Sequence, residues 1–216
     1  MGQRWSLVFT AADASDQLST NAAGRLELRL YGKPVAEIDI SASYLTIFYA
    51  WHGQEVDAAT AYSNLIGPDE LHRAIVKTWV NSSFGNTRLL TRWSPGVKRD
   101  FANRYRDQQW TIDTRLYPIR LLRERTLERH PLLEQWGQPI DGKPQNYADL
   151  MFRESEIIVS TMLRLVREHG IPSMPVHDSL LVPVSDVEIG KRLLNEQFVK
   201  LAGVRPTLKV RTLYDF

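Results

Sequence analysis

Residues 170–184 decide the fold, and they read GIPSMPVHDSLLVPV. Two short apolar runs flank the pair His177-Asp178, and this pattern predicts a β-hairpin with the pair at its tip. The preceding stretch, Tyr147–His169, is the longest with helical periodicity, and glycine and proline follow it directly. The sequence therefore predicts a long helix followed at once by a hairpin that carries an aspartate.

A second hairpin is predicted near the start of the chain. Leucines alternate with charged residues over Arg25–Leu30, a Gly-Lys-Pro turn follows, and alternation resumes over Val35–Ile40. Because side chains on a strand alternate between faces, Glu37 and Asp39 share the face opposite the isoleucines. We expect Asp39 on an open sheet face, with Glu37 as a solvated or supporting carboxylate.

The remaining elements indicate an α+β fold. Strands at both ends of the chain and helices between them predict an antiparallel sheet with helices packed on one face. A helical, basic region inserted between the strand segments completes the architecture. The other predicted elements are the helices 42–50, 69–84, 119–129 and 185–202, and a last strand over 207–213.

Composition excludes several classes of protein. The 216 residues have a formal net charge of +2 and contain no cysteine, which excludes disulfide frameworks and thiol chemistry. No stretch approaches the ~20 apolar residues of a membrane span. The apolar run Leu7–Phe9 is shorter than a signal peptide requires, so we expect a cytoplasmic protein. Residues 88–129 form a basic block with eleven Lys and Arg against five Asp and Glu.

Asp39 and Asp178 suggest a site for divalent cations. Two carboxylates on neighbouring strands suit Mg²⁺, which prefers one or two carboxylates together with substrate phosphates. Two such ions can activate an attacking oxygen and stabilise a leaving pyrophosphate. Taken alone, each aspartate is also typical of a helix cap or a turn.

The predicted helix 69–84 presents Arg73 and Lys77 four residues apart on one face, and Asn81 continues that face. A planar guanidinium and an ammonium at this spacing can hold a triphosphate. The same spacing is also typical of a solvated helix face.

These elements together resemble the conserved motifs of family A DNA polymerases and of single-subunit, phage-type RNA polymerases. Residues 37–44 resemble motif A, residues 73–85 motif B and residues 176–180 motif C, in the same order along the chain. The chain also resembles short polymerase-like proteins of bacterial plasmids and phages, through Glu154-Ser155 and residues 170–179. One departure is Asn81, where family A enzymes carry an aromatic residue, and Trp79, Phe84 or another aromatic residue would have to take its place.

The resemblance implies three segments: 1–66 with the first hairpin and motif A, 67–146 as a fingers-like region with motif B, and 147–216 completing the palm. It also implies a role for each matched residue. The catalytic pair Asp39 and Asp178 would hold two Mg²⁺, or Mn²⁺, together with the carbonyl of Ile40. The incoming nucleotide would contact Arg73, Lys77, Tyr44 and Asn81, and the primer and template would contact His177, Glu154 and Ser155.

The implied function is template-directed nucleotidyl transfer by a DNA polymerase-like enzyme in plasmid or phage DNA replication. Its partners would be a DNA primer-template, (d)NTPs and other replication proteins, with no membrane. Trp93, Tyr105, Trp110 and Tyr117 lie within the basic block and could stack on unpaired bases. Three alternatives stay open: a primase or RNA polymerase with the same palm, a non-catalytic nucleic-acid-binding subunit, and an HD-type phosphohydrolase.

Overall fold

A computed structural model describes residues 22–215. The run Leu7–Phe9 lies outside the described residues. Within the described part of the chain, no helix is long and apolar enough to cross a membrane.

The chain divides into two compact units. Among the described residues, unit 1 comprises 22–40, 157–197 and 208–215, and unit 2 comprises 41–156 and 198–207. The three-segment division at residues 66 and 146 addresses function and stays a prediction.

Unit 1 is built on an antiparallel sheet whose central strand is β2 (Lys33–Ile40). On one side β2 pairs with β4 (Ser179–Pro183), which in turn pairs with β3 (Met174–Val176). On its other side β2 pairs with β1 (Arg29–Leu30) at its start and with β5 (Leu208–Thr212) along the rest of its length. The central strand is therefore held on both edges, by segments from both ends of the described chain.

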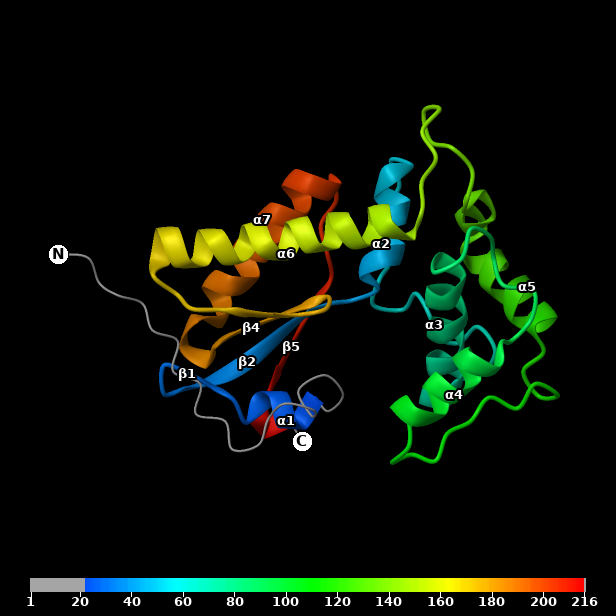
Figure 1. The fold of residues 1–216 in the computed structure, drawn as a ribbon, viewed down its shortest axis with the longest axis horizontal. Helices are drawn as coiled ribbons and strands as arrows, with labels where there is room; N and C mark the ends of the chain where they lie inside the picture. Colours follow the sequence, from blue (N-terminus) through cyan, green and yellow to red (C-terminus); the bar gives the residue numbers. More distant parts are fainter. Residues whose placement is uncertain (1–21, 216) are drawn as a thin grey trace. The chain divides into compact units, whose positions relative to one another are not determined.

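Helices cover one face of this sheet. Figure 1 shows α6 (Tyr147–His169) and α7 (Val187–Ala202) running across one face, with the short helix α1 (Ala22–Leu26) on the other side. Ile38, Leu180 and Val182 are fully buried on the helix-covered face. The α+β class, with an antiparallel sheet and helices packed on one face, is confirmed.

Both predicted hairpins form, with one correction. The first turns at Tyr31 and Gly32, whose φ angles of 51° and 77° are those of a tight hairpin turn. The predicted strand Arg25–Leu30 is wrong over most of its length, because residues 22–26 form α1 and only Arg29–Leu30 pair with β2. Leu26 packs with Leu30 and Val35 in a small apolar cluster, which the helical turn permits as readily as a strand would.

Unit 2 is helical. Its helices are α2 (Ser43–Trp51), α3 (Glu70–Phe84), α4 (Pro95–Arg104) and α5 (Ile119–Arg129), followed by a 3₁₀ turn over Pro131–Gln135. The helix α3 contacts both α4 and α5. Three of these four helices were predicted from the sequence. The fourth, α4, begins with Ser94 accepting a hydrogen bond from the Val97 N–H at 3.1 Å and with proline in its first position, which is a typical helix start.

A buried polar network stabilises unit 2. The Nε2 of His130 lies 2.7 Å from the carbonyl oxygen of Ala61, and its Nδ1 lies 3.1 Å from the Tyr49 hydroxyl. Because a carbonyl only accepts, Nε2 carries the proton and Nδ1 accepts from the tyrosine. Burial, the largest cause, lowers the pKa of His130 and raises the pKa of Tyr49.

We expect His130 to make stability depend on pH. Its pKa is lower in the folded state than the ordinary value of about 6.5, so protons favour the unfolded state. The contribution of neutral His130 to the free energy of unfolding is complete above about pH 6.5 and is lost as the pH falls toward the folded-state pKa. Urea unfolding should show that the free energy of unfolding falls more between pH 8 and pH 5.5 in the wild type than in His130→Gln. Equal decreases in the two proteins would contradict this.

Gly190 of α7 packs directly against the sheet. A Cβ atom at this position would lie 2.8 Å from Cδ1 of Ile38 and 3.4 Å from Cγ1 of Val182. We expect Gly190→Leu to lower the free energy of unfolding by about 1–3 kcal/mol through overpacking. In Gly96→Leu the nearest atom to the new Cβ is 3.8 Å away, so this control should be neutral or stabilising in urea unfolding.

Candidate active site

The strands β2 and β4 place Asp39 and Asp178 at the same end of the sheet. Asp39 is the penultimate residue of β2 and is the register partner of Ser179, the first residue of β4. The N–H of Ile40 donates to the carbonyl oxygen of Asp178 at 3.0 Å. The structure therefore brings together the two aspartates that the sequence predicted as a pair, and both are half-buried.

Asp178 occupies the tight turn between β3 and β4. His177, the other turn residue, has a φ of 50°, in the left-handed region that L-residues rarely adopt. The Ser179 hydroxyl lies 2.8 Å from the carbonyl oxygen of Val176 and so closes the turn. His177 is exposed beside Asp178. Backbone strain of this kind is common where a side chain is held for a function.

The sequence left Glu37 as either a solvated or a supporting carboxylate, and its burial excludes the solvated alternative. It is only 2% exposed and accepts hydrogen bonds from Arg25 Nη2 at 2.8 Å and from Ser179 Oγ at 2.7 Å. Arg25 comes from α1 and Ser179 from β4, so the carboxylate of Glu37 joins three elements. A buried carboxylate needs such a partner, because an isolated buried charge is very costly.

Tyr44 lies in the first turn of α2, just after the end of β2. Ala42 precedes this helix with a φ of 50°, which is also in the left-handed region. The Tyr44 ring is half-buried and meets the Tyr147 ring edge-on, with centroids 5.4 Å apart. This contact holds the ring orientation within unit 2.

The helix α3 carries Arg73, Lys77 and Asn81 along one half-buried face. Arg73 forms a 3.6 Å ion pair with Glu70, one turn earlier on the same helix. This pair leaves the face cationic at Lys77. These residues share one face of α3 in unit 2, and phosphate binding by that face stays a prediction.

The aromatic residues of α3 are not available for binding. Trp79 and Phe84 are both completely buried, so neither can take the place of the aromatic residue that family A enzymes carry at the position of Asn81. On α6, Glu154 is buried and Ser155 is exposed, so only Ser155 presents its side chain to solvent.

The basic block is mostly exposed. Its arginines are distributed over α4, α5 and the flanking loops, and the exposed ones are Arg88, Arg92, Arg99, Arg104, Arg106, Arg115, Arg120, Arg123, Arg125 and Arg129. Trp93, Tyr105, Trp110 and Tyr117 of the block are half-buried and make local contacts, and its fifth aromatic residue, Phe101, is buried. Trp93 donates to the Tyr117 carbonyl at 3.0 Å, and Tyr105 packs against Trp110. The charge of the block thus faces solvent, whereas its aromatic rings contribute to packing.

Two carboxylates at the end of the sheet are a donor set that Mg²⁺ accepts, and a magnesium site there stays a prediction. Among residues 22–215, no group of three or more His, Asp or Glu side chains is arranged to hold a metal ion. Mg²⁺ keeps several waters and takes one or two carboxylates plus substrate phosphates, which matches Asp39 and Asp178. His177 and Asp178 lie in a hairpin turn, whereas an HD-type phosphohydrolase would place them on a helix.

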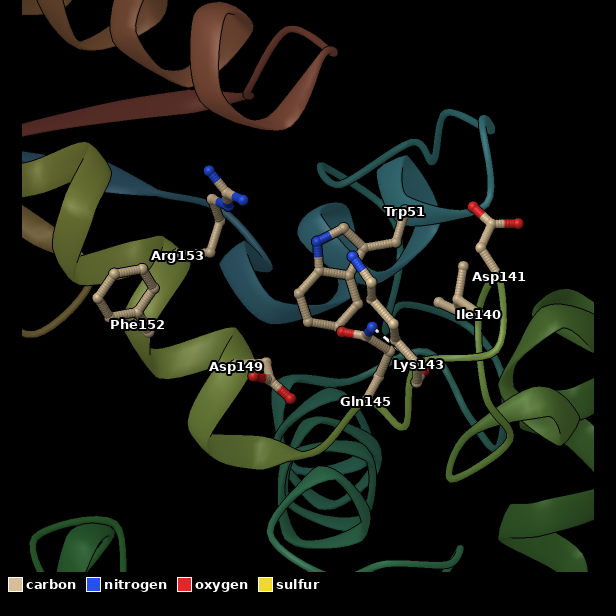
Figure 2. A pocket seen from close by; sticks show the side chains of 8 residues that line it. All are labelled: Trp51, Ile140, Asp141, Lys143, Gln145, Asp149, Phe152 and Arg153. Carbon is tan, nitrogen blue, oxygen red and sulfur yellow. Dashed lines mark hydrogen bonds between the residues drawn. The ribbon is translucent and has the colours of Figure 1, made fainter.

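Unit 2 also contains a pocket of about 310 Å³ that the sequence did not predict (Figure 2). Figure 2 shows Trp51 facing Lys143 and Gln145, with Phe152 and Arg153 on α6. Two cationic side chains, Lys143 and Arg153, are balanced by Asp141 and Asp149. The full lining is Trp51, Ile140, Asp141, Lys143, Gln145, Asp149, Phe152 and Arg153. The pocket offers aromatic surface without a net charge.

Comparisons with known proteins find similarity to solved structures. No protein-family model matches the chain, and no curated protein matches it. Among solved structures, it is similar to the POL domain of Pol1 from M. smegmatis, which was solved in complex with DNA primer-template and dNTP. The match has 11% sequence identity and a TM-score of 0.37, and it covers 82% of this chain and 38% of that chain. This chain thus spans less than half the length of the structure it matches.

Proposed function

We propose that the protein is a template-directed nucleotidyltransferase of the DNA polymerase type, acting with two Mg²⁺ ions in plasmid or phage DNA replication. The observation that carries the proposal is the placement of Asp39 and Asp178 at one end of adjacent antiparallel strands. The ordered resemblance of three motifs supports it.

Asp39 and Asp178 would hold the metal ions, and the Ile40 carbonyl would be a further ligand. When bound, the ions supply activation of the primer 3′-oxygen and stabilisation of the pyrophosphate leaving group. The 3′-oxygen forms a bond to the α-phosphorus of the nucleotide, the bond to the β-phosphate oxygen breaks, and the hydroxyl proton passes to water. The protein contributes mainly positioning and charge, as expected for phosphoryl transfer.

Arg73 and Lys77 would bind the β- and γ-phosphates, and Asn81 the incoming base or the template. Tyr44 would lie under the sugar and exclude a 2′-hydroxyl by its bulk, which favours dNTPs. The primer terminus would contact His177, and the primer-template would contact Glu154 and Ser155.

The exposed arginines of the basic block would bind nucleic-acid backbone. Such binding weakens as salt rises, because each phosphate contact releases counterions. This surface also favours a second candidate, a non-catalytic nucleic-acid-binding subunit. The buried state of Trp79 and Phe84 favours it too, because the α3 face then lacks the aromatic side chain of the polymerase pattern.

Primer extension tests the proposal. A primed DNA template is incubated with Mg²⁺ and with either dNTPs or NTPs, and EDTA serves as the control. Products whose sequence follows the template support the proposal, and dNTP use distinguishes a DNA polymerase from a primase or RNA polymerase. Salt-sensitive DNA binding without extension by either nucleotide set would instead support the binding subunit.

A further inference from the structure

Glu37 lies next to the candidate metal site without pointing to solvent. It precedes Asp39 by two residues on β2, so both side chains start from the same face of the sheet. Its carboxylate is buried, with Arg25 and Ser179 both hydrogen-bonded to Oε1. The other carboxylate oxygen, Oε2, is buried without a hydrogen-bond partner, as is Nε of Arg25.

Ser179 connects this carboxylate to the turn that carries Asp178. Its hydroxyl lies 2.7 Å from Glu37 Oε1 and 2.8 Å from the Val176 carbonyl oxygen. The hydroxyl has one proton and can donate to only one of these acceptors at a time. Both acceptors converge on this hydroxyl, so its hydrogen bond either closes the turn at Val176 or joins the turn to Glu37 on β2.

The buried ion pair of Arg25 and Glu37 is energetically costly if it serves stability alone. A buried ion pair with unsatisfied atoms on both partners is often no more stable than apolar residues of similar volume. The rule that buried polar atoms have hydrogen-bond partners is broken mainly at functional sites. Here the exception sits where two strands must keep Asp39 and Asp178 in fixed relation.

We infer that Glu37, acting through Ser179, is a positioning residue that fixes the Asp178 turn against the strand that carries Asp39. The inference rests on the proposed function, because its purpose is to hold both carboxylates ready for one set of divalent cations. Arg25 completes the arrangement by neutralising the Glu37 charge.

The test measures binding of Mn²⁺ alone, by electron paramagnetic resonance, in the full-length protein. Wild type should bind Mn²⁺, and Asp39→Asn and Asp178→Asn should lose that binding. We expect Ser179→Ala and Glu37→Gln to weaken Mn²⁺ binding by about 10–100-fold, the usual effect of groups that orient metal ligands. Ser185→Ala, which removes an exposed hydroxyl elsewhere in unit 1, is the matched control and should bind as wild type does.

Primer extension gives a second readout. In Ser179→Ala the Mg²⁺ concentration for half-maximal extension should rise, and saturating Mg²⁺ should recover most of the rate. Thermal unfolding monitored by circular dichroism shows whether each variant is folded at the assay temperature.

The outcomes separate the two claims. Mn²⁺ binding that depends on both aspartates but is unchanged in Ser179→Ala and Glu37→Gln overturns the positioning role and leaves the proposed function intact. A loss of binding that only follows unfolding of Ser179→Ala also overturns it, in favour of a structural role. Absence of Mn²⁺ binding and of extension in the wild type overturns the proposed function itself.

Discussion

Asp39→Asn and Asp178→Asn are each expected to reduce Mg²⁺-dependent primer extension by about 10³-fold or more. Losing one group that stabilises transition-state charge typically costs about 10²–10³-fold, and a metal ligand also holds the ion itself. The amide keeps the shape of the side chain, so its geometry in the sheet is preserved while its charge is removed. Initial rates of extension at fixed primer-template concentration measure the effect.

A second prediction for the same two variants does not depend on primer extension. Mg²⁺ should raise the melting temperature of the wild type, because a ligand that binds only the folded state stabilises it. Neither asparagine variant should respond. Asp107→Asn, an exposed change of the same charge in unit 2, should keep both the extension rate and the response to Mg²⁺. Full activity in either active-site variant would exclude a two-aspartate metal site.

Arg25→Leu is expected to lower the free energy of unfolding by about 3–5 kcal/mol. Arg25 is the cationic partner of the buried Glu37 carboxylate, and the side chains are 12% and 2% exposed. Removing one partner of a buried pair leaves an uncompensated charge, which costs far more than the pair itself contributes. Urea unfolding followed by tryptophan fluorescence gives the change.

A double-mutant cycle tests the cause. The double variant Arg25→Leu/Glu37→Leu has no uncompensated charge at this position. It should recover most of the lost free energy of unfolding. Arg29→Leu is the control on the neighbouring strand, because the exposed Arg29 bonds only to the Gly32 carbonyl among the described contacts, and it should change stability by no more than about 0.5 kcal/mol. A double variant as unstable as Arg25→Leu would show that the loss comes from packing.

Local signals predicted most elements well. The bounds of α5 and α6 match the sequence prediction, and the hairpin with Asp178 at its tip forms as expected. In each case the start or stop is encoded within a few residues, by proline, glycine or the change of period. The predicted pairing of Asp39 with Asp178 followed from the same hairpin logic combined with the family resemblance.

The contacts between residues far apart in the chain were not predicted from the sequence. Alternation over Arg25–Leu30 predicted a strand, yet Arg25 lies in α1 and pairs with Glu37, twelve residues later. Glu37 and Ser179 are 142 residues apart, and no local pattern reveals their hydrogen bond. Burial likewise decides that Trp79 and Phe84 belong to the core, because aromatic residues on a helix are equally compatible with a core and with a binding face.

The order in which β2 acquires its neighbours has a consequence for synthesis. At about 5–20 residues per second, a ribosome that has made Glu37 needs roughly 7–28 s to reach Ser179. During that interval β2 has neither β4 nor β5 beside it, and its apolar face and open edges are exposed. The whole first stretch of unit 2, residues 41–156, is made during that interval. The two aspartates can meet only after Asp178 has been made, so products that end before it carry the basic residues of the 88–129 block but no assembled carboxylate pair.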